Sequence, residues 1–296
     1  MNTSLSVLLA GCALTGLMTS CGPGAEDSKP KVDEEILDPN SSLNTNFDGK
    51  IFSIPSPMQT ALLLKEANAP FNEAYLNKLD KVGSYSTEMK KALNLGIYGT
   101  DLGYLSIYKQ NSLSLKYLAT IEKLTSDLGL EGAFDKAFMS RFEKNSTNQD
   151  SMMVIVADAF KKSDNFLKSS DRKNVSSLIL VGGWVESLFL ACEINKSGSN
   201  QKIIERIGEQ QETLNTIIDI LEMYNKKGTN TEMIADMKDL KGQFDKIMIQ
   251  YDFVQPKTDA KNKITTLQHK TTVKVDPAVL ASINQKISAI RNKITA

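Results

Sequence analysis

The chain of 296 residues contains a single histidine, His269, and only three cysteines. Ser-His-Asp and Cys-His hydrolases need a histidine as general base, and no glycine-flanked serine supports His269 in that role. The sequence also lacks the HExxH zinc motif, paired CxxC motifs, the P-loop and the dinucleotide-binding glycine pattern. We therefore predict no metal site and no cofactor, and we expect His269 to lie in an exposed polar linker.

Net charge is absent as well, because 35 basic residues balance 35 acidic ones, and the composition does not favour nucleic acid as a partner. The charges are nevertheless unevenly placed. Residues 22–50 hold seven acids against three bases, and residues 254–296 hold eight bases against two acids. We interpret both regions as solvated surfaces. The alternative for residues 257–293 is docking on anionic headgroups or on the glycans and phosphates of a cell envelope.

The N-terminus has no charged side chain before Glu26, and residues 5–18 form an apolar run. This run is shorter than the roughly 20 apolar residues of a membrane helix and is typical of a secretion signal. It leads into Leu17-Met18-Thr19-Ser20-Cys21, a stretch that resembles the lipobox of bacterial lipoproteins. Leu9-Ala10-Gly11-Cys12 is the alternative lipobox, but the apolar region before it is too short. A further departure from the pattern is that residues 1–4 lack Lys and Arg.

The lipobox resemblance implies a localisation in the cell envelope and a lipid modification. Residues 1–20 would be removed as a signal peptide, and Cys21 would carry acyl and diacylglycerol groups, with palmitate among them. The protein would then be held in the cell envelope by this lipid anchor. Gly22, rather than Asp, resembles lipoproteins released to the outer membrane. Only Cys192 would remain as a free thiol, and its apolar neighbours predict a small buried side chain.

Composition divides the rest of the chain into four parts. Residues 21–50, rich in Pro, Gly, Ser, Asn and acids, are predicted to form a flexible tether. A helical domain is expected over residues 51–253. Residues 254–275 alternate Thr, Val and Lys and predict a polar linker or hairpin. Residues 276–296 begin with Asp-Pro and predict a C-terminal helix that packs on the domain.

Apolar side chains recur at helical spacing through most of the chain. The predicted fold class is all-α, a bundle of eight to ten mostly antiparallel helices. Residues 201–227 and 230–251 each keep a heptad seam and are joined by a short link, which predicts a helical hairpin. The other expected helices cover residues 86–110, 112–128, 132–144, 148–169 and 276–296, with a further one starting at Pro57.

Residues 175–194 are apolar on every side and contain one charged side chain, Glu186, before Cys192. Such a helix is either a membrane span or the central helix of a large core. A glutamate in the middle of a span is costly in lipid, and the amphipathic helices around it need a partner to cover. We therefore predict the buried central helix.

Small residues predict how this central helix meets helix 86–110. Gly183, Ser187 and Ala191 fall at i, i+4 and i+8, and Gly99 and Gly103, with Gly96 close to the same face, offer a matching surface. A crossing at these positions would bring two acids, Asp101 and Glu186, into the core.

The candidate buried polar site consists of Asp101 and Glu186 with Asn94, Tyr98 and Tyr104 nearby. A buried acid is paired, hydrogen-bonded or neutral. Three interpretations follow, namely a structural network, ligand recognition, and catalysis by shifted carboxyl groups. The residue pattern favours the structural network and leaves any catalytic residue unknown.

Three segments are similar to stretches of uncharacterised helical lipoproteins of the Bacteroidota, and the similarity would cover residues 55–195. They are ALNLGIYGTDLGYLSIY (92–108), NQDSMM (148–153) and GGWVESLFLA (182–191). The resemblance supports localisation in the envelope and the helical fold, and it implies no particular activity. The first hypothesis is a non-enzymatic binding or adaptor protein that has the membrane and an envelope protein as partners. The alternative is an enzyme or metal-dependent protein that uses Asp101 and Glu186.

Overall fold

The computed structural model describes most of the chain from residue 42 onward. The predicted signal peptide, Cys12, Cys21, His269, the start of the helix expected at Pro57 and most of the predicted tether lie outside the described residues. The described ranges are residues 42–48, 50–55, 68–130, 136–145, 148–198, 200–266 and 270–296.

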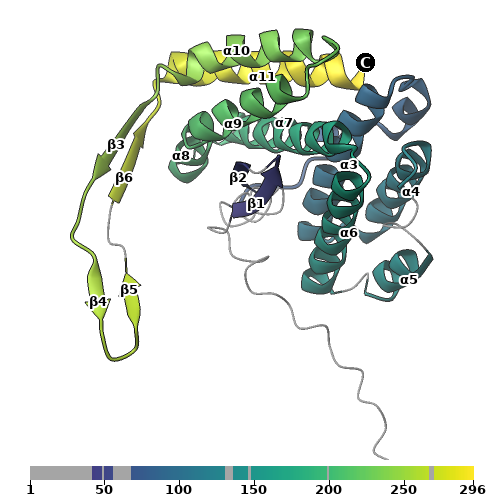
Figure 1. Cartoon of the computed structure of the whole chain (residues 1–296), viewed down its shortest axis with the longest axis horizontal. Coiled ribbons are helices and arrows are strands. Elements are labelled where there is room, and N and C mark those ends of the chain that lie inside the picture. The colour runs from purple at the N-terminus through teal and green to yellow at the C-terminus, as the bar shows by residue number, and fades with distance from the viewer. Residues whose placement is uncertain are drawn as a thin grey trace, which may run out of the picture. The chain divides into compact units, whose positions relative to one another are not determined.

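The predicted all-α class is confirmed, because the described residues contain nine α-helices and only short two-stranded sheets (Figure 1). Two short 3-10 helices, Glu73–Tyr75 and Leu79–Ser84, precede the first α-helix. The α-helices are α3 (Glu88–Ile107), α4 (Asn111–Asp127), α5 (Lys136–Lys144), α6 (Gln149–Ser169), α7 (Lys173–Ser197), α8 (Gln201–Gly208), α9 (Gln210–Met223), α10 (Thr231–Phe244) and α11 (Pro277–Thr295).

The core is built around α3 and α7, which pack along each other, and α4, α6 and α11 also contact α3. Every residue of α3 from Ala92 onward is buried. Helix α7 is long and apolar enough to span a membrane, yet 89% of its most apolar window is buried inside the protein. The predicted central helix is therefore confirmed as the interior of a helical bundle.

Helices α3 and α7 approach each other most closely at Gly96 and Gly182. A Cβ atom at Gly96 would overlap the carbonyl oxygen of Ile179, and one at Gly182 would overlap the carbonyl oxygen of Leu93. The two backbones are therefore in direct contact. The expected contact through Gly99 was wrong, because a Cβ atom at Gly99 would overlap the ring of Phe160 on α6.

The predicted helix 201–227 is broken into α8 and α9 at Glu209. Gly208 ends α8 where a strand packs against it, and a Cβ atom there would overlap the side chain of Val273. Helices α9 and α10 contact each other, as expected of the predicted hairpin. The second predicted helix, 230–251, is also too long, because α10 ends at Phe244 and a strand begins at Met248.

Three antiparallel strand pairs complete the fold. Strands β1 (Ser42–Phe47) and β2 (Lys50–Pro55) form a hairpin where the predicted tether meets the predicted helical domain. Strand β3 (Met248–Asp252) pairs with β6 (Lys270–Lys274), and β4 (Lys257–Asp259) pairs with β5 (Ile264–Thr266). We call residues 248–274 the β arm. Figure 1 shows the β arm leading away from the helices to the β4–β5 turn.

Helix α11 closes the bundle after the β arm. The Asp276 side chain accepts a hydrogen bond from the backbone N–H of Ala278 at 2.8 Å, and Pro277 occupies the first helical position, so that the start of the helix is fixed. Its isoleucines at positions 283, 287, 290 and 294 are buried. The helix packs against α3, α7 and α10, and in Figure 1 it lies beside α10.

Candidate functional site

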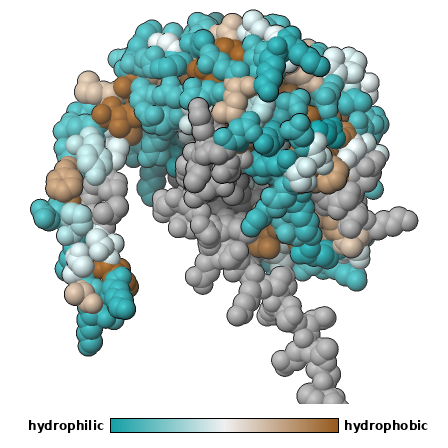
Figure 2. All heavy atoms as spheres, viewed as in Figure 1, coloured by the Kyte–Doolittle hydropathy of each residue, from teal (hydrophilic) through white to brown (hydrophobic). Residues whose placement is uncertain are grey.

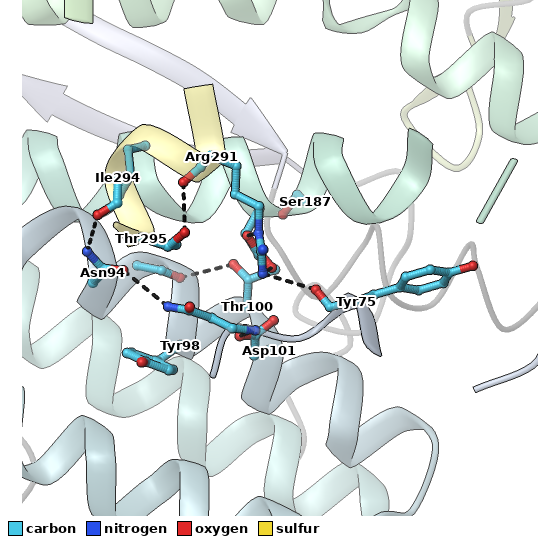
Figure 3. Close-up of polar contacts among 12 residues, drawn as sticks. Tyr75, Asn94, Tyr98, Thr100, Asp101, Ser187, Arg291, Ile294 and Thr295 are labelled. Atoms are coloured by element: carbon cyan, nitrogen blue, oxygen red, sulfur yellow. Dashed lines mark hydrogen bonds and ion pairs between the residues drawn. The ribbon is translucent and has the colours of Figure 1, made fainter. Parts of the chain in front are cut away.

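The close α3–α7 contact places the two predicted acids in the core. Asp101 on α3 and Glu186 on α7 have no exposed surface. A third charged residue that was not predicted, Arg291 of α11, reaches them from the C-terminal helix. Figure 3 shows its side chain extending toward the backbone carbonyl of Tyr75.

Glu186 and Arg291 form a buried ion pair with two hydrogen bonds. Nε of Arg291 donates to Oε2 of Glu186 at 2.7 Å, and Nη2 donates to Oε1 at 2.8 Å. The same Nη2 also donates to the carbonyl oxygen of Tyr75 at 3.0 Å. The guanidinium carbon lies 4.3 Å from the ring centroid of Phe189. Both carboxylate oxygens are therefore occupied, and the guanidinium is held in a fixed orientation.

Asp101 is held differently from Glu186. Its Oδ2 accepts a hydrogen bond from the backbone N–H of Asn77 at 3.0 Å, whereas no described group donates a hydrogen bond to Oδ1. Burial raises the pKa of Asp101 well above its usual range. The negative charge of Glu186 and a side-chain hydrogen bond to it raise that pKa further, against the opposing effects of Arg291 and Asn77. Burial and the charge of Glu186 therefore favour the protonated form of Asp101.

With Asp101 in its protonated form, the ion pair of Glu186 and Arg291 leaves the site electrically neutral. Burial lowers the pKa of Arg291, but the charge and hydrogen bonds of Glu186 outweigh burial and raise that pKa. A neutral, internally paired set avoids the several-kcal/mol cost of leaving an isolated charge in a core.

The Asp101→Asn variant tests the protonation state, because Asn keeps the acceptor for Asn77 and supplies an N–H donor for Glu186. A raised folded-state pKa means that the native protein holds a proton which the unfolded chain releases above about pH 4. The free energy that this proton contributes to wild-type stability is full below that pH and is lost as the pH rises through the folded-state pKa. The stability of the variant should not depend on pH in this way. Its free energy of unfolding should therefore gain on that of wild type by up to about 1.4 kcal/mol per pH unit. Urea unfolding between pH 4 and pH 8 measures it.

The opposite result would assign a different charge to Asp101. If the Asn variant were several kcal/mol less stable than wild type at neutral pH, Asp101 would be ionised in the native protein. Thr100→Ala, at the residue that precedes Asp101 in α3, is a suitable control for a substitution at a buried position. Thr100 donates a hydrogen bond to the carbonyl oxygen of Gly183 at 3.2 Å but carries no titratable group.

Asn77 joins the acids to the rest of the polar network. Beyond its backbone contact with Asp101, its Nδ2 donates to Oδ1 of Asn94 at 3.1 Å and to the hydroxyl of Tyr85 at 3.2 Å. Its carbonyl oxygen accepts a hydrogen bond from the hydroxyl of Tyr117 at 2.7 Å. One asparagine in a loop thereby links side chains from three different segments.

The other predicted site residues are also buried, and they hold neighbouring segments in place. Nδ2 of Asn94 donates to the carbonyl oxygen of Ile294 near the end of α11 at 2.9 Å. The hydroxyl of Tyr98 donates to the carbonyl oxygen of Lys78 at 2.7 Å. The hydroxyl of Tyr104 accepts a hydrogen bond from the backbone N–H of Asn72 at 3.1 Å. These contacts attach the loop before α3, and the end of α11, to α3.

Sequence reasoning missed Arg291 and Asn77. A signal for Arg291 was present, because it lies four residues after Ile287 and one after Ile290, which places a charge on the apolar stripe of α11. Asn77 had no such signal, since it lies in a loop between two short 3-10 helices, where apolar residues follow no helical spacing.

The contacts at this site favour the structural interpretation of the buried acids. Both Glu186 oxygens are bonded to Arg291, and Asp101 and Glu186 lack solvent contact. Among the described residues, no group of three or more His, Cys, Asp or Glu side chains is placed to hold a metal ion. The network joins α3, α7, α11 and the loop before α3 into one unit.

A second candidate surface lies on the β arm. Eight large hydrophobic side chains are exposed in the described part of the chain, and six of them belong to this arm. Figure 2 shows hydrophobic residues along the arm among hydrophilic ones. The region predicted to be a polar linker or hairpin thus belongs to a longer hairpin with apolar side chains in solvent. The six residues are Met248, Ile249, Tyr251, Phe253, Val254 and Ile264.

Exposed apolar side chains are scattered singly on most soluble proteins, so the concentration of six on one hairpin makes it a candidate surface. Comparisons of the chain with protein-family models, with curated proteins and with solved structures find no match. The function of the protein is therefore inferred from its own residues and contacts.

Proposed function

We propose that the protein is a lipid-anchored component of the cell envelope that works by binding rather than by catalysis. The β arm is its binding element, and the bundle is the scaffold that presents it. The observation that carries this proposal is the gathering of exposed apolar side chains on the arm, away from the closed core.

The buried acids support a scaffold role better than the alternative enzyme. General acid or base catalysis needs a group within hydrogen-bond reach of a substrate. Asp101 and Glu186 have no exposed surface, and Arg291 occupies both oxygens of Glu186. A substrate would have to displace α11, with its row of buried isoleucines, before it could reach either acid.

The lipid anchor rests on the lipobox-like sequence that ends at Cys21, with Gly22 favouring the outer membrane. Twenty residues separate Cys21 from Ser42, the first residue of β1. Fully extended, this stretch spans at most about 70 Å. The folded body would therefore stay close to the membrane surface, where its partners are an envelope component and the lipid itself.

Mass spectrometry of the tagged protein, purified from gently solubilised envelopes, tests both parts of the proposal. We expect an acylated Cys21 peptide and an envelope component, protein or lipid, that is enriched at constant stoichiometry. The double variant Phe253→Ser/Val254→Ser should lose that component, because it removes exposed apolar contacts from the β arm. The matched control is Phe166→Ser, which changes a 49%-exposed phenylalanine on α6 and should retain it.

Three results would contradict the proposal in separate ways. An unmodified Cys21 would remove the lipid anchor. Retention of the component by the arm variant would place the binding element elsewhere. Enrichment of nothing beyond a tag-only sample would favour the enzyme alternative.

A further inference from the structure

The β3–β6 part of the β arm has an apolar face and a face that is polar apart from Met248. Antiparallel partners lie on the same face of a strand pair, and alternate residues share that face. Ile249 is opposite Val273 in the β3–β6 ladder, and Tyr251 lies on the same side. The other face carries Gln250 and, opposite Met248, the lysine at position 274. The arm is therefore an amphipathic ribbon rather than a uniformly polar hairpin.

The apolar face begins in the core and leads out into solvent. Val273 is 4% exposed and packs where Gly208 leaves room, whereas Ile249 is 37% exposed and Tyr251 is 58% exposed. Beyond the end of β3, Phe253 is 69% exposed. Exposure therefore rises along this face from Val273 to Phe253, and Met248, Val254 and Ile264 elsewhere on the arm are also exposed, at 62%, 43% and 57%. These accessible side chains suit contact with an apolar environment.

The arm is rich in lysine from residue 257 onward. Residues 257–274 hold five lysines and one acid, Asp259, and three of these lysines lie on the outer β4–β5 pair or its turn. The acid is engaged locally, because it accepts hydrogen bonds from the backbone N–H groups of Lys261 and Asn262 at 3.0 and 3.1 Å. The lysines at positions 257, 261, 263 and 274 have exposed side chains.

The remaining basic residues of the C-terminal region are neutralised within the fold. Lys286 pairs with Asp239, and Lys293 pairs with Asp236 at 2.7 Å, so α11 has acids of α10 beside its lysines. Arg291 is buried against Glu186. The free positive charge expected over residues 257–293 is therefore confined to the β arm.

We infer that the β arm docks on an anionic lipid surface, with its exposed aromatic and aliphatic side chains at the headgroup level and its lysines on lipid phosphates. This inference rests on the proposed function, in which the arm is the binding element and the body is held near a membrane. Lysines beside exposed aromatic side chains are typical of segments that lie in a membrane interface. A second copy of the chain is a poorer occupant, because two arms, each with five lysines against two acids, repel each other.

A fluorescent label in place of Phe253, the most exposed of the six apolar side chains, tests the inference in the full lipidated protein. The variant Phe253→Cys would carry an environment-sensitive fluorophore. Burial raises the pKa of the Cys192 thiol to about 12, so this buried thiol should remain unlabelled. The protein is mixed with vesicles of phosphatidylcholine alone or with added phosphatidylglycerol. We expect a blue shift of the emission only with phosphatidylglycerol, and added salt should reverse it.

The charge requirement is tested by removing three arm lysines together. Lys257→Gln/Lys261→Gln/Lys263→Gln should weaken the arm's contact with phosphatidylglycerol vesicles on the order of a hundredfold and abolish the shift. The matched control is Lys202→Gln/Lys226→Gln/Lys227→Gln, which removes the same charge from exposed positions elsewhere and should keep the shift. A label placed by Phe166→Cys should report water in all vesicles.

The result for the arm can be separated from the result for the anchor. Sedimentation with phosphatidylcholine vesicles reports the lipid anchor, whereas the emission reports the arm in each lipid mixture. Sedimentation without a shift in phosphatidylglycerol overturns the lipid inference and leaves the anchor intact. An equal shift in both lipids overturns the requirement for anionic lipid. A shift that needs added envelope protein would assign the arm to a protein partner instead.

Discussion

Glu186→Gln is expected to destabilise the protein by about 3–5 kcal/mol, because it leaves the Arg291 guanidinium buried without a carboxylate. Glu186 accepts two hydrogen bonds from the guanidinium, at 2.7 and 2.8 Å. In the variant the acceptors that remain are the new amide oxygen and the carbonyl of Tyr75, and both are neutral. A buried cation with only neutral acceptors is far less stable than a bidentate ion pair. Urea unfolding at neutral pH, followed by circular dichroism, measures the change.

Asp101 makes this effect dependent on a second residue. In the Glu186→Gln variant Asp101 can release its proton and become the counter-ion of Arg291, which brings the loss toward the lower end of the range. The double variant Asp101→Asn/Glu186→Gln has no such replacement. We expect it to be less stable than the sum of the two single variants predicts, which is the sign of direct coupling.

A matched variant separates charge from packing at this site. Glu186→Leu/Arg291→Met removes both charges and leaves none unpaired, so it should be more stable than Glu186→Gln despite two substitutions. Equal or lower stability of this pair would mean that the ion pair itself, rather than the avoidance of an unpaired charge, holds α11 on the bundle. A loss below about 1 kcal/mol for Glu186→Gln would mean that water reaches Arg291.

Gly182→Ala is the second variant with a large expected effect. The new methyl group would overlap the carbonyl oxygen of Leu93 and lie 2.7 Å from its carbonyl carbon. These are backbone atoms of α3, which cannot rotate away as a side chain would, so α3 and α7 must separate along the core. We expect a loss of about 3–5 kcal/mol, or failure to fold, measured by thermal and urea unfolding.

Two other glycines serve as comparisons for Gly182. Gly96→Ala should be similarly costly, because its methyl group would lie 2.6 Å from the backbone nitrogen of Gly183. Gly242→Ala lies in α10 with no atom within 4 Å of the new methyl group, so a gain of up to about 1 kcal/mol is expected from helix propensity. If Gly182→Ala were as well tolerated as Gly242→Ala, the α3–α7 contact would not depend on direct backbone approach.

The amino-acid sequence by itself determined the all-α class, most helix positions and the burial of the central helix. These follow from local patterns, namely apolar spacing, the Asp276-Pro277 start of α11 and the apolar surroundings of Glu186. The same patterns predicted that Asp101 and Glu186 would share the core. The spacing of apolar residues along a helix indicates which face is buried, and about ten consecutive residues are enough to show this spacing.

Only the tertiary structure decided what each buried face contacts. Arg291 lies 105 residues from Glu186, and no local period links the two positions. Residues 248–252 continue the heptad seam of α10, yet they form a strand because residues 270–274 pair with them. Gly208, the last residue of α8, leaves room for the side chain of Val273. The ion pair, the strand and this close contact each depend on a distant segment, which is why the local sequence could not predict them.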